Sequence, residues 1–132
     1  MIFENTTQIA SDLLEQQYQH LHHADILRVL ENARLQFLEH IGVPQAKLLE
    51  EDCFLVLSKC DVQFLREIKE EELIARVEFK SLLDESSFVL SQELLKKPKR
   101  IAVRATIELV AMSAKTRRRR ALHEELRRVL VS

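Results

Sequence analysis

Residues 20–44 read HLHHADILRVLENARLQFLEHIGVP, and this stretch decides the fold of the chain. Its apolar side chains recur every three or four positions, which places them on one face of a helix. The stop signals are complete, because His40 precedes Gly42, which can adopt the left-handed conformation, and Pro44 follows. The pattern predicts a helix over residues 23–41. Its apolar positions are Ile26, Leu27, Leu30, Ala33, Phe37, Leu38 and Ile41.

After this helix the apolar pattern changes to strict alternation. Segments 54–64, 73–79, 88–94 and 101–109 alternate with period two, which is typical of strands. The connections between them are short, whereas parallel strands need crossovers of about a dozen residues or more, so the strands are expected to be mostly antiparallel. A long helix followed by a four-strand meander predicts an α+β fold in which the sheet curls around the helix.

The two ends of the chain carry weaker patterns. Residues 121–131 have apolar side chains at helical spacing and predict a short terminal helix. Residues 2–9 are compatible with an edge strand, whereas residues 11–19 stay open between a helical turn and a loop. The outward rows of the sheet are expected to mix apolar residues with charges, which allows a dimer without requiring one. These apolar positions are Leu57, Ile74, Val89 and Val110.

Length and composition narrow the class of protein. A chain of 132 residues, 46% hydrophobic and 31% charged, predicts one soluble globular domain over residues 1–132. The net charge of −1 does not indicate that the chain as a whole binds nucleic acid. A single glycine excludes the glycine-rich loops that hold phosphates in P-loop and Rossmann proteins.

Cys53 and Cys60 are the only cysteines, and no Cys/His spacing typical of a metal site surrounds them. The sequence has no signal peptide and no long apolar run. We therefore expect two reduced thiols, a cytoplasmic location and no membrane span.

Residues 20–34 also resemble the signature of the hotdog-fold acyl-CoA thioesterases, in particular those similar to 4-hydroxybenzoyl-CoA thioesterase. That signature reads roughly Gly-His-Val-Asn-Asn-Ala-x-Tyr-Leu-x-x-x-Glu-x-Ala-Arg. The resemblance extends over nearly the whole chain and implies a curved antiparallel sheet wrapped around a central helix. It further implies thioester hydrolysis at a dimer interface and a homodimer or a dimer of dimers. The directly matching residues are His20, Ala24, Leu27, Glu31, Ala33 and Arg34.

The departures from this signature lie where the chemistry is expected. The family usually has an aspartate four residues before the signature histidine, and this chain has Gln16 there. Glutamine can orient a water molecule but cannot remove its proton. Asp12 or Glu15 could supply the carboxylate if the loop is realigned. Two functions therefore stay open: an acyl-CoA or acyl-carrier thioesterase, and an inactive hotdog protein that binds acyl thioesters or serves as an assembly or regulatory module.

Two histidines and one helix carboxylate are the candidate catalytic residues. His20 matches the signature histidine and His23 lies close to it, and histidine titrates near neutral pH. Their alternative role is capping or packing at the start of the helix. Glu31 lies on the central helix, from which some hotdog families take their carboxylate; its alternative role is a structural pair with Arg28 or Arg34. Spacing places no third ligand beside the histidines, so no metal is predicted.

The resemblance also implies where the substrate binds, with CoA as part of the substrate and no separate cofactor. Backbone amides near Asp25 and Ile26 would polarise the thioester carbonyl at the helix N-terminus. The basic run KTRRRR (residues 115–120), through Lys115, Arg117 and Arg118, would hold the CoA phosphates. A solvated turn is the alternative for this run, and nucleic acid is weakly supported because no aromatic platform accompanies it. The acyl chain would run between helix and sheet, with Leu30, Phe37, Phe54 and Phe64 as candidate lining.

Overall fold

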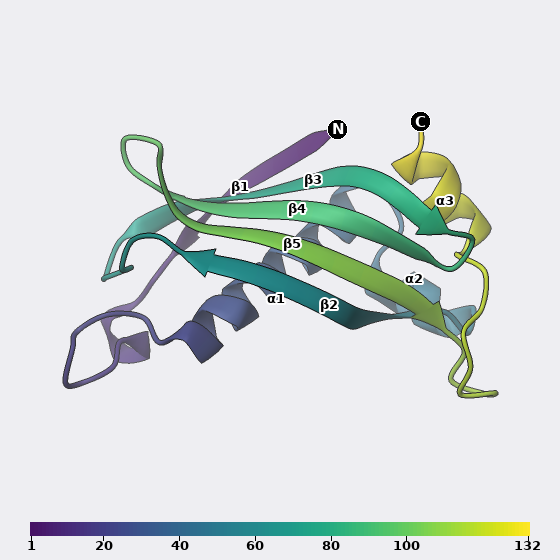
Figure 1. Ribbon diagram of the computed structural model, residues 1–132, viewed down its shortest axis with the longest axis horizontal. Coiled ribbons are helices and arrows are strands. Elements are labelled where there is room, and N and C mark those ends of the chain that lie inside the picture. The colour runs from purple at the N-terminus through teal and green to yellow at the C-terminus, as the bar shows by residue number, and fades with distance from the viewer.

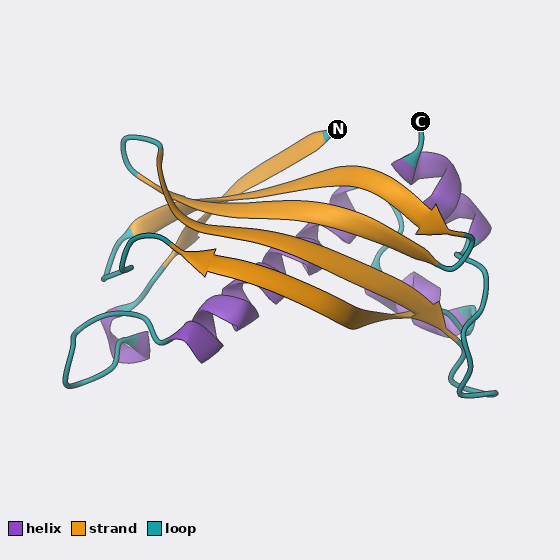
Figure 2. Ribbon diagram, in the orientation of Figure 1, coloured by secondary structure: helices purple, strands orange, loops and turns teal.

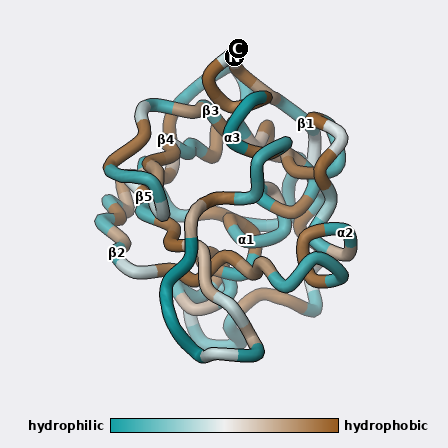
Figure 3. Tube along the Cα trace, turned by 90° about the vertical axis from the view of Figure 1, so that its right-hand side faces the viewer, coloured by the Kyte–Doolittle hydropathy of each residue, from teal (hydrophilic) through white to brown (hydrophobic).

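The computed structural model describes residues 1–132. Five antiparallel strands form one sheet in the order β1-β3-β4-β5-β2, and in Figures 1 and 2 the long helix α1 crosses behind it. Seen end-on in Figure 3, the strands form an arc around α1. This is the predicted α+β hotdog fold, which is confirmed. The elements are β1 (Ile2–Gln8), η1 (Ser11–Leu13), α1 (His23–His40), α2 (Gln45–Glu50), β2 (Phe54–Phe64), β3 (Glu72–Asp84), β4 (Ser87–Lys96), β5 (Arg100–Met112) and α3 (Glu124–Leu130).

Both ends of α1 are capped, and the cap at its end is the one that the sequence predicts. At the start, the Nδ1 atom of His22 accepts a hydrogen bond from the Ala24 amide at 3.1 Å. At the end, Gly42 has a φ of 83°, and the Val43 amide donates to the Leu38 carbonyl at 3.0 Å, which is the bonding of a Schellman cap. The helix therefore begins and ends at defined residues.

The core lies between the concave face of the sheet and one face of α1. Leu30 and Phe37 of the helix are 1% and 0% exposed, and they belong to one apolar cluster with residues of all the central strands. Burial of this face supplies the main free energy that holds helix and sheet together, since isolated helices of this length are marginal in water.

The position of β2 corrects the expectation of a four-strand meander. Only β3, β4 and β5 follow one another as neighbours, whereas β2 pairs with β5 at the far edge, from Phe54 opposite Met112 to Phe64 opposite Val103. Residues 65–71 carry the chain back across the β4–β5 end, where the fully buried side chain of Ile68 anchors the crossing. Alternation of apolar and polar residues identifies a strand, but it does not show which strand lies beside it in the sheet. The position of β2 could therefore not be predicted in this way.

The structure shows which elements form at the two ends of the chain, where the sequence patterns are weaker. β1 is the predicted edge strand, and the terminal helix is shorter than predicted, at Glu124–Leu130. Helix α2 was not predicted, because Pro44 signals the end of α1 and here also precedes the first residue of a new helix. Residues 11–19 contain the short turn η1 and then a loop.

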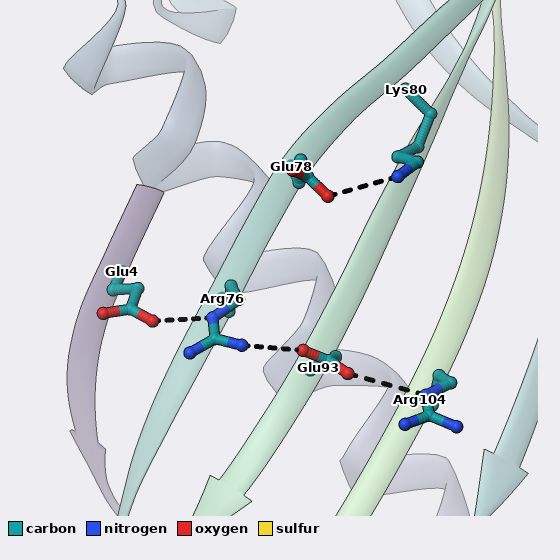
Figure 4. Close-up of polar contacts among 6 residues, drawn as sticks. All are labelled: Glu4, Arg76, Glu78, Lys80, Glu93 and Arg104. Atoms are coloured by element: carbon teal, nitrogen blue, oxygen red, sulfur yellow. Dashed lines mark hydrogen bonds and ion pairs between the residues drawn. The ribbon is translucent and has the colours of Figure 1, made fainter. Parts of the chain in front are cut away.

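The face of the sheet turned away from α1 carries charges. Arg76 on β3 contacts Glu4 on β1 at 2.6 Å and Glu93 on β4 at 3.0 Å, and Glu93 also contacts Arg104 on β5 at 3.5 Å (Figure 4). The hydrogen bond that Arg76 donates to Glu4 raises the pKa of Arg76. Two of the four apolar residues expected on this face depart from the expectation. Leu57 lies opposite Leu109 and lines hollows on the α1 side of the sheet with Glu31 and Arg34, because opposed residues of an antiparallel pair lie on the same side. Val110 is buried.

Candidate functional site

A cavity of about 510 Å³ lies at the N-terminus of α1, beside the end of β2. A small hairpin forms one of its walls: Leu14 and Leu21 form an isolated bridge, and the Glu15 amide donates to the His20 carbonyl at 2.9 Å. The opposite wall is formed by Phe64 and the residues that follow β2. The lining residues are Glu15, Tyr18, His20, Leu21, His22, His23, Ile26, Phe64, Leu65, Arg66 and Glu67.

The hairpin brings a carboxylate to the predicted histidine. Glu15 and His20 are directly opposed, and side chains of opposed residues in an antiparallel pair lie on the same side. Both residues are half-buried and line the cavity, whereas Gln16 is exposed and does not. The carboxylate of this loop is therefore Glu15, one position before the residue to which the sequence signature points.

The three histidines have different surroundings. The Nδ1 atom of His20 is buried and has no hydrogen-bond partner in the chain, although the residue lines the cavity. His22 caps α1, which confirms a capping role for one histidine of the cluster. His23 stacks on His22 with ring centroids 3.9 Å apart, is exposed, and lines the cavity.

The first turn of α1 has one backbone amide that is free. The amides of Asp25 and Ile26, expected to polarise a carbonyl, both donate to the His22 carbonyl at 2.9 and 3.0 Å. The Ala24 amide donates to the His22 ring. The His23 amide donates to no group of the chain, so it is the donor at the helix N-terminus that a bound ligand can use.

Glu31 and the basic run lie apart from this cavity. Glu31 is eight residues into the helix, roughly 12 Å from His23 along its axis, and it forms no ion pair with Arg28 or Arg34 within 4.0 Å. The run at residues 115–120 follows β5 at the opposite end of the sheet from the start of α1 (Figure 1). Within one chain, Lys115, Arg117 and Arg118 are therefore not brought together with His20.

The basic loop is nevertheless ordered by a single carboxylate. Asp52 accepts hydrogen bonds from the Ser113 hydroxyl, from the Ala114 amide at 2.9 Å and from the Lys115 amide at 3.3 Å. The bond from Ser113 and those from the two amides lower the pKa of Asp52. Arg120 in turn donates to the Asp52 carbonyl at 3.0 Å. The loop is thus held in one conformation with its other cations exposed.

Two smaller hollows continue along the seam between α1 and β2. The first, of about 150 Å³, is lined by Leu27, Leu30 and Cys60 among others, and the second, of about 190 Å³, by Leu35 and Phe54 among others. Of the residues expected to line an acyl site, Leu30, Phe54 and Phe64 do line these cavities. Phe37 is fully buried against the core and lines none of them.

No group of three or more His, Cys, Asp or Glu side chains lies close enough together to hold a metal ion. Both cysteines are free, Cys53 buried and Cys60 exposed. No helix combines the length and the apolar character needed to cross a membrane.

Comparison with known families agrees with the fold. The model of the thioesterase-like superfamily matches residues 14–130, which includes the hairpin, α1 and the whole sheet except β1. The chain therefore belongs to the thioesterase-like superfamily. No curated protein sequence matches it.

Several solved structures share the architecture. A Staphylococcus aureus protein in complex with CoA superposes with a TM-score of 0.89 at 16% identity, covering 99% of this chain and 82% of that one. A 1,4-dihydroxy-2-naphthoyl-CoA thioesterase from Synechocystis has a TM-score of 0.89 at 12% identity, covering 100% and 97%. A DHNA-CoA thioesterase from Staphylococcus aureus has a TM-score of 0.87 at 14% identity, covering 98% and 91%. At these identities the likeness establishes the fold.

Proposed function

We propose that this chain hydrolyses acyl thioesters of CoA or of an acyl carrier in the cavity at the N-terminus of α1. One observation carries the proposal: Glu15 and His20 line the same cavity as His23, whose backbone amide has no acceptor in the chain. A group that accepts a proton and a donor for a developing oxyanion are the two requirements of thioester hydrolysis. Membership of the thioesterase-like superfamily supports this chemistry.

The reaction follows from this arrangement. With the thioester carbonyl at the His23 amide, a water molecule beside Glu15 and His20 loses a proton to one of them while its oxygen attacks the carbonyl carbon. The amide stabilises the oxyanion that forms. The carbon–sulfur bond then breaks, and the proton held by the base passes to the departing CoA sulfur. The deprotonated base is thereby restored for the next turnover.

A dimer formed through β2 would complete the site with phosphate-binding groups. β2 is an edge strand of eleven residues whose Val56, Leu57 and Phe64 are 39%, 45% and 52% exposed, and such an edge favours pairing with another strand. A two-fold axis at its middle would run the two β2 strands antiparallel. The Phe54 end of one strand, next to its own basic loop, would then lie beside the Phe64 end and the cavity of the partner.

This dimer explains the separation of the predicted site residues. Lys115, Arg117 and Arg118 would contact CoA phosphates bound at the partner's cavity, although they are remote from the cavity of their own chain. A dimer of dimers formed through the outer face of the sheet would have to bury the Arg76–Glu93 network, which is costly. We therefore favour the dimer. The two free cysteines fit a reducing compartment such as the cytoplasm.

A second candidate function is a non-catalytic protein that binds acyl thioesters. Gln16 favours it, because the position that carries the aspartate in related enzymes here has a side chain that cannot remove a proton. The free His23 amide would still allow such a protein to bind the thioester carbonyl.

Hydrolysis of a panel of acyl-CoAs separates the two functions. The purified chain is incubated with short, medium, long and aromatic acyl-CoAs, and the released CoA thiol is measured beside CoA binding by calorimetry. Turnover that is lost in His20→Ala supports the proposal. Measurable CoA binding without turnover of any substrate would overturn it in favour of the binding protein.

A further inference from the structure

Arg34 is a partly buried cation that forms no ion pair, and Glu31 on the preceding turn is the carboxylate whose charge acts on it. Its Nη1 atom donates to the Oε1 atom of Gln92 at 3.0 Å, and this is its only side-chain hydrogen bond. No acidic oxygen lies within 4.0 Å of the guanidinium, in contrast to Arg76, Arg104 and Arg119. An arginine stays charged in any protein environment, so the remaining donors of this side chain have an unsatisfied preference for an anion.

A fully buried glutamine holds this guanidinium in place. Gln92 on β4 is 0% exposed, and its Nε2 atom donates to the Leu30 carbonyl of α1 at 3.0 Å. Both ends of its amide are therefore occupied, one by the helix and one by Arg34. A polar side chain in the middle of an apolar core has a high desolvation cost unless its bonds are complete, and here those bonds orient a cation.

The guanidinium lies between the two hollows of the α1–β2 seam. Arg34, Glu31 and Leu57 line both of them, and otherwise the walls are mostly apolar. The residues that line the three cavities follow one another along β2, from Phe64 through Cys60 and Leu57 to Phe54. The three cavities thus lie in order along the seam from the proposed thioester site to Arg34, and the first shares no lining residue with the other two.

The distance from the His23 amide to the Arg34 guanidinium sets the length of the acyl chain that would reach the arginine. Because the Gln92 bond holds the Arg34 head near Leu30, the distance from the His23 amide is roughly 10 Å along the helix axis. A medium-length acyl chain whose carbonyl lies at His23 spans this distance. Its far end, rather than its carbonyl, would then meet the cation.

We propose that Arg34 selects acyl groups that end in a carboxylate, so that the preferred substrates are medium-length ω-carboxyacyl thioesters. The inference rests on the proposed thioester site. The free guanidinium donors would bind the terminal carboxylate in a bidentate pair, while the apolar walls cover the methylenes. Burial lowers the pKa of Arg34, while the charges of Glu31 and Cys60 act in the opposite direction.

The test compares suberoyl-CoA with octanoyl-CoA, two substrates of the same chain length that differ in the terminal carboxylate. The wild type is expected to have the higher kcat/KM for suberoyl-CoA. Arg34→Met should lower this value by about tenfold or more, as expected for loss of a charge-assisted pair, and should leave the value for octanoyl-CoA within about twofold. Arg34→Lys, which keeps the charge without the planar fork, should retain an intermediate preference. Arg127→Met, an exposed position on α3, is the matched control and should change neither value.

Binding of non-hydrolysable thioethers separates this inference from the proposed function. If neither thioester is hydrolysed but ω-carboxyheptyl-CoA binds more tightly than octyl-CoA in an Arg34-dependent manner, the inference stands and the hydrolase proposal fails. Equal kcat/KM values for the two substrates in the wild type would overturn the inference. An equal loss on both substrates in Arg34→Met, with the circular dichroism of the native fold, would also overturn it and assign Arg34 a structural role.

Discussion

Glu15 and His20 lie opposite each other in a hairpin at the start of α1, where the Glu15 amide donates to the His20 carbonyl at 2.9 Å. The Leu14–Leu21 bridge next to them keeps this register. The pair has the composition of a carboxylate–imidazole dyad, although no hydrogen bond joins the two side chains. The pair lies next to the position at which the thioesterase signature has an aspartate. Gln16 at that position cannot remove a proton from water, whereas Glu15 can.

Replacement of Glu15 by glutamine should lower kcat for acyl-CoA hydrolysis by about 100-fold or more, the usual effect of losing a general base. Steady-state kinetics with the best substrate of the panel measures this. Asp12→Asn is the matched control, because Asp12 is exposed on η1 and lines no cavity. Glu31→Gln is the competing variant. If Glu31→Gln abolishes turnover and Glu15→Gln does not, the catalytic carboxylate comes from the helix and the dyad is wrong.

A positive charge on β2 should dissociate the proposed dimer. Val56→Lys places an ammonium group on the exposed edge, where lysine disfavours strand pairing. Sedimentation velocity should then detect the monomer at concentrations where the wild type is a dimer. Ile2→Lys introduces the same charge on β1, the other edge strand, and should leave the dimer intact. The opposite result, with Ile2→Lys alone producing monomers, would place the interface on β1.

Two phenylalanines separate stability from substrate binding. Phe37 of α1 is fully buried and packs against Phe3 of β1. Phe37→Ala should therefore reduce the free energy of unfolding by about 3–5 kcal/mol. Phe64 is 52% exposed at the cavity, so Phe64→Ala should change that free energy by only about 0.5 kcal/mol while raising KM. Urea denaturation and steady-state kinetics measure the two effects. A strongly destabilised Phe64→Ala variant would indicate that this residue belongs to the core.

Asp84 should contribute to unfolding at low pH. Hydrogen bonds from the Ser86 amide, and from the hydroxyls of Ser87 and Ser86, lower the pKa of Asp84 from 3.8 to about 2. A carboxyl group whose pKa is lower in the folded state stabilises the fold fully above its unfolded pKa, and the effect is lost as pH falls through the folded value. The melting temperature should therefore decline as pH falls from about 4 to about 2.

Asp84→Asn provides the control for this decline. The variant should be less stable than the wild type at pH 7, and the difference should shrink toward pH 2, where the wild-type carboxylate is also protonated. A constant difference in melting temperature across this range would show that the ionised form of Asp84 contributes nothing to stability.

The sequence by itself determined the elements that depend on local periodicity. Spacings of three and four identified α1 to within one residue of its end, and alternation identified four strands, because these periods report which side of an element faces the core. The run from His20 to Arg34 also identified the family, since its residues lie within one continuous element and its cap. These predictions needed no knowledge of contacts between distant residues.

Only the tertiary structure decided which of these elements and residues meet. The pairing of β2 with β5 depends on a crossing anchored by Ile68, and no period in the sequence encodes it. Glu15 rather than Gln16 lines the cavity because of the register of an irregular hairpin, where a shift of one residue moves a side chain to the other face. The bond between Arg34 and Gln92 joins residues 58 positions apart. Such relationships arise from packing between elements, so they could be found only once the sheet had been placed around α1.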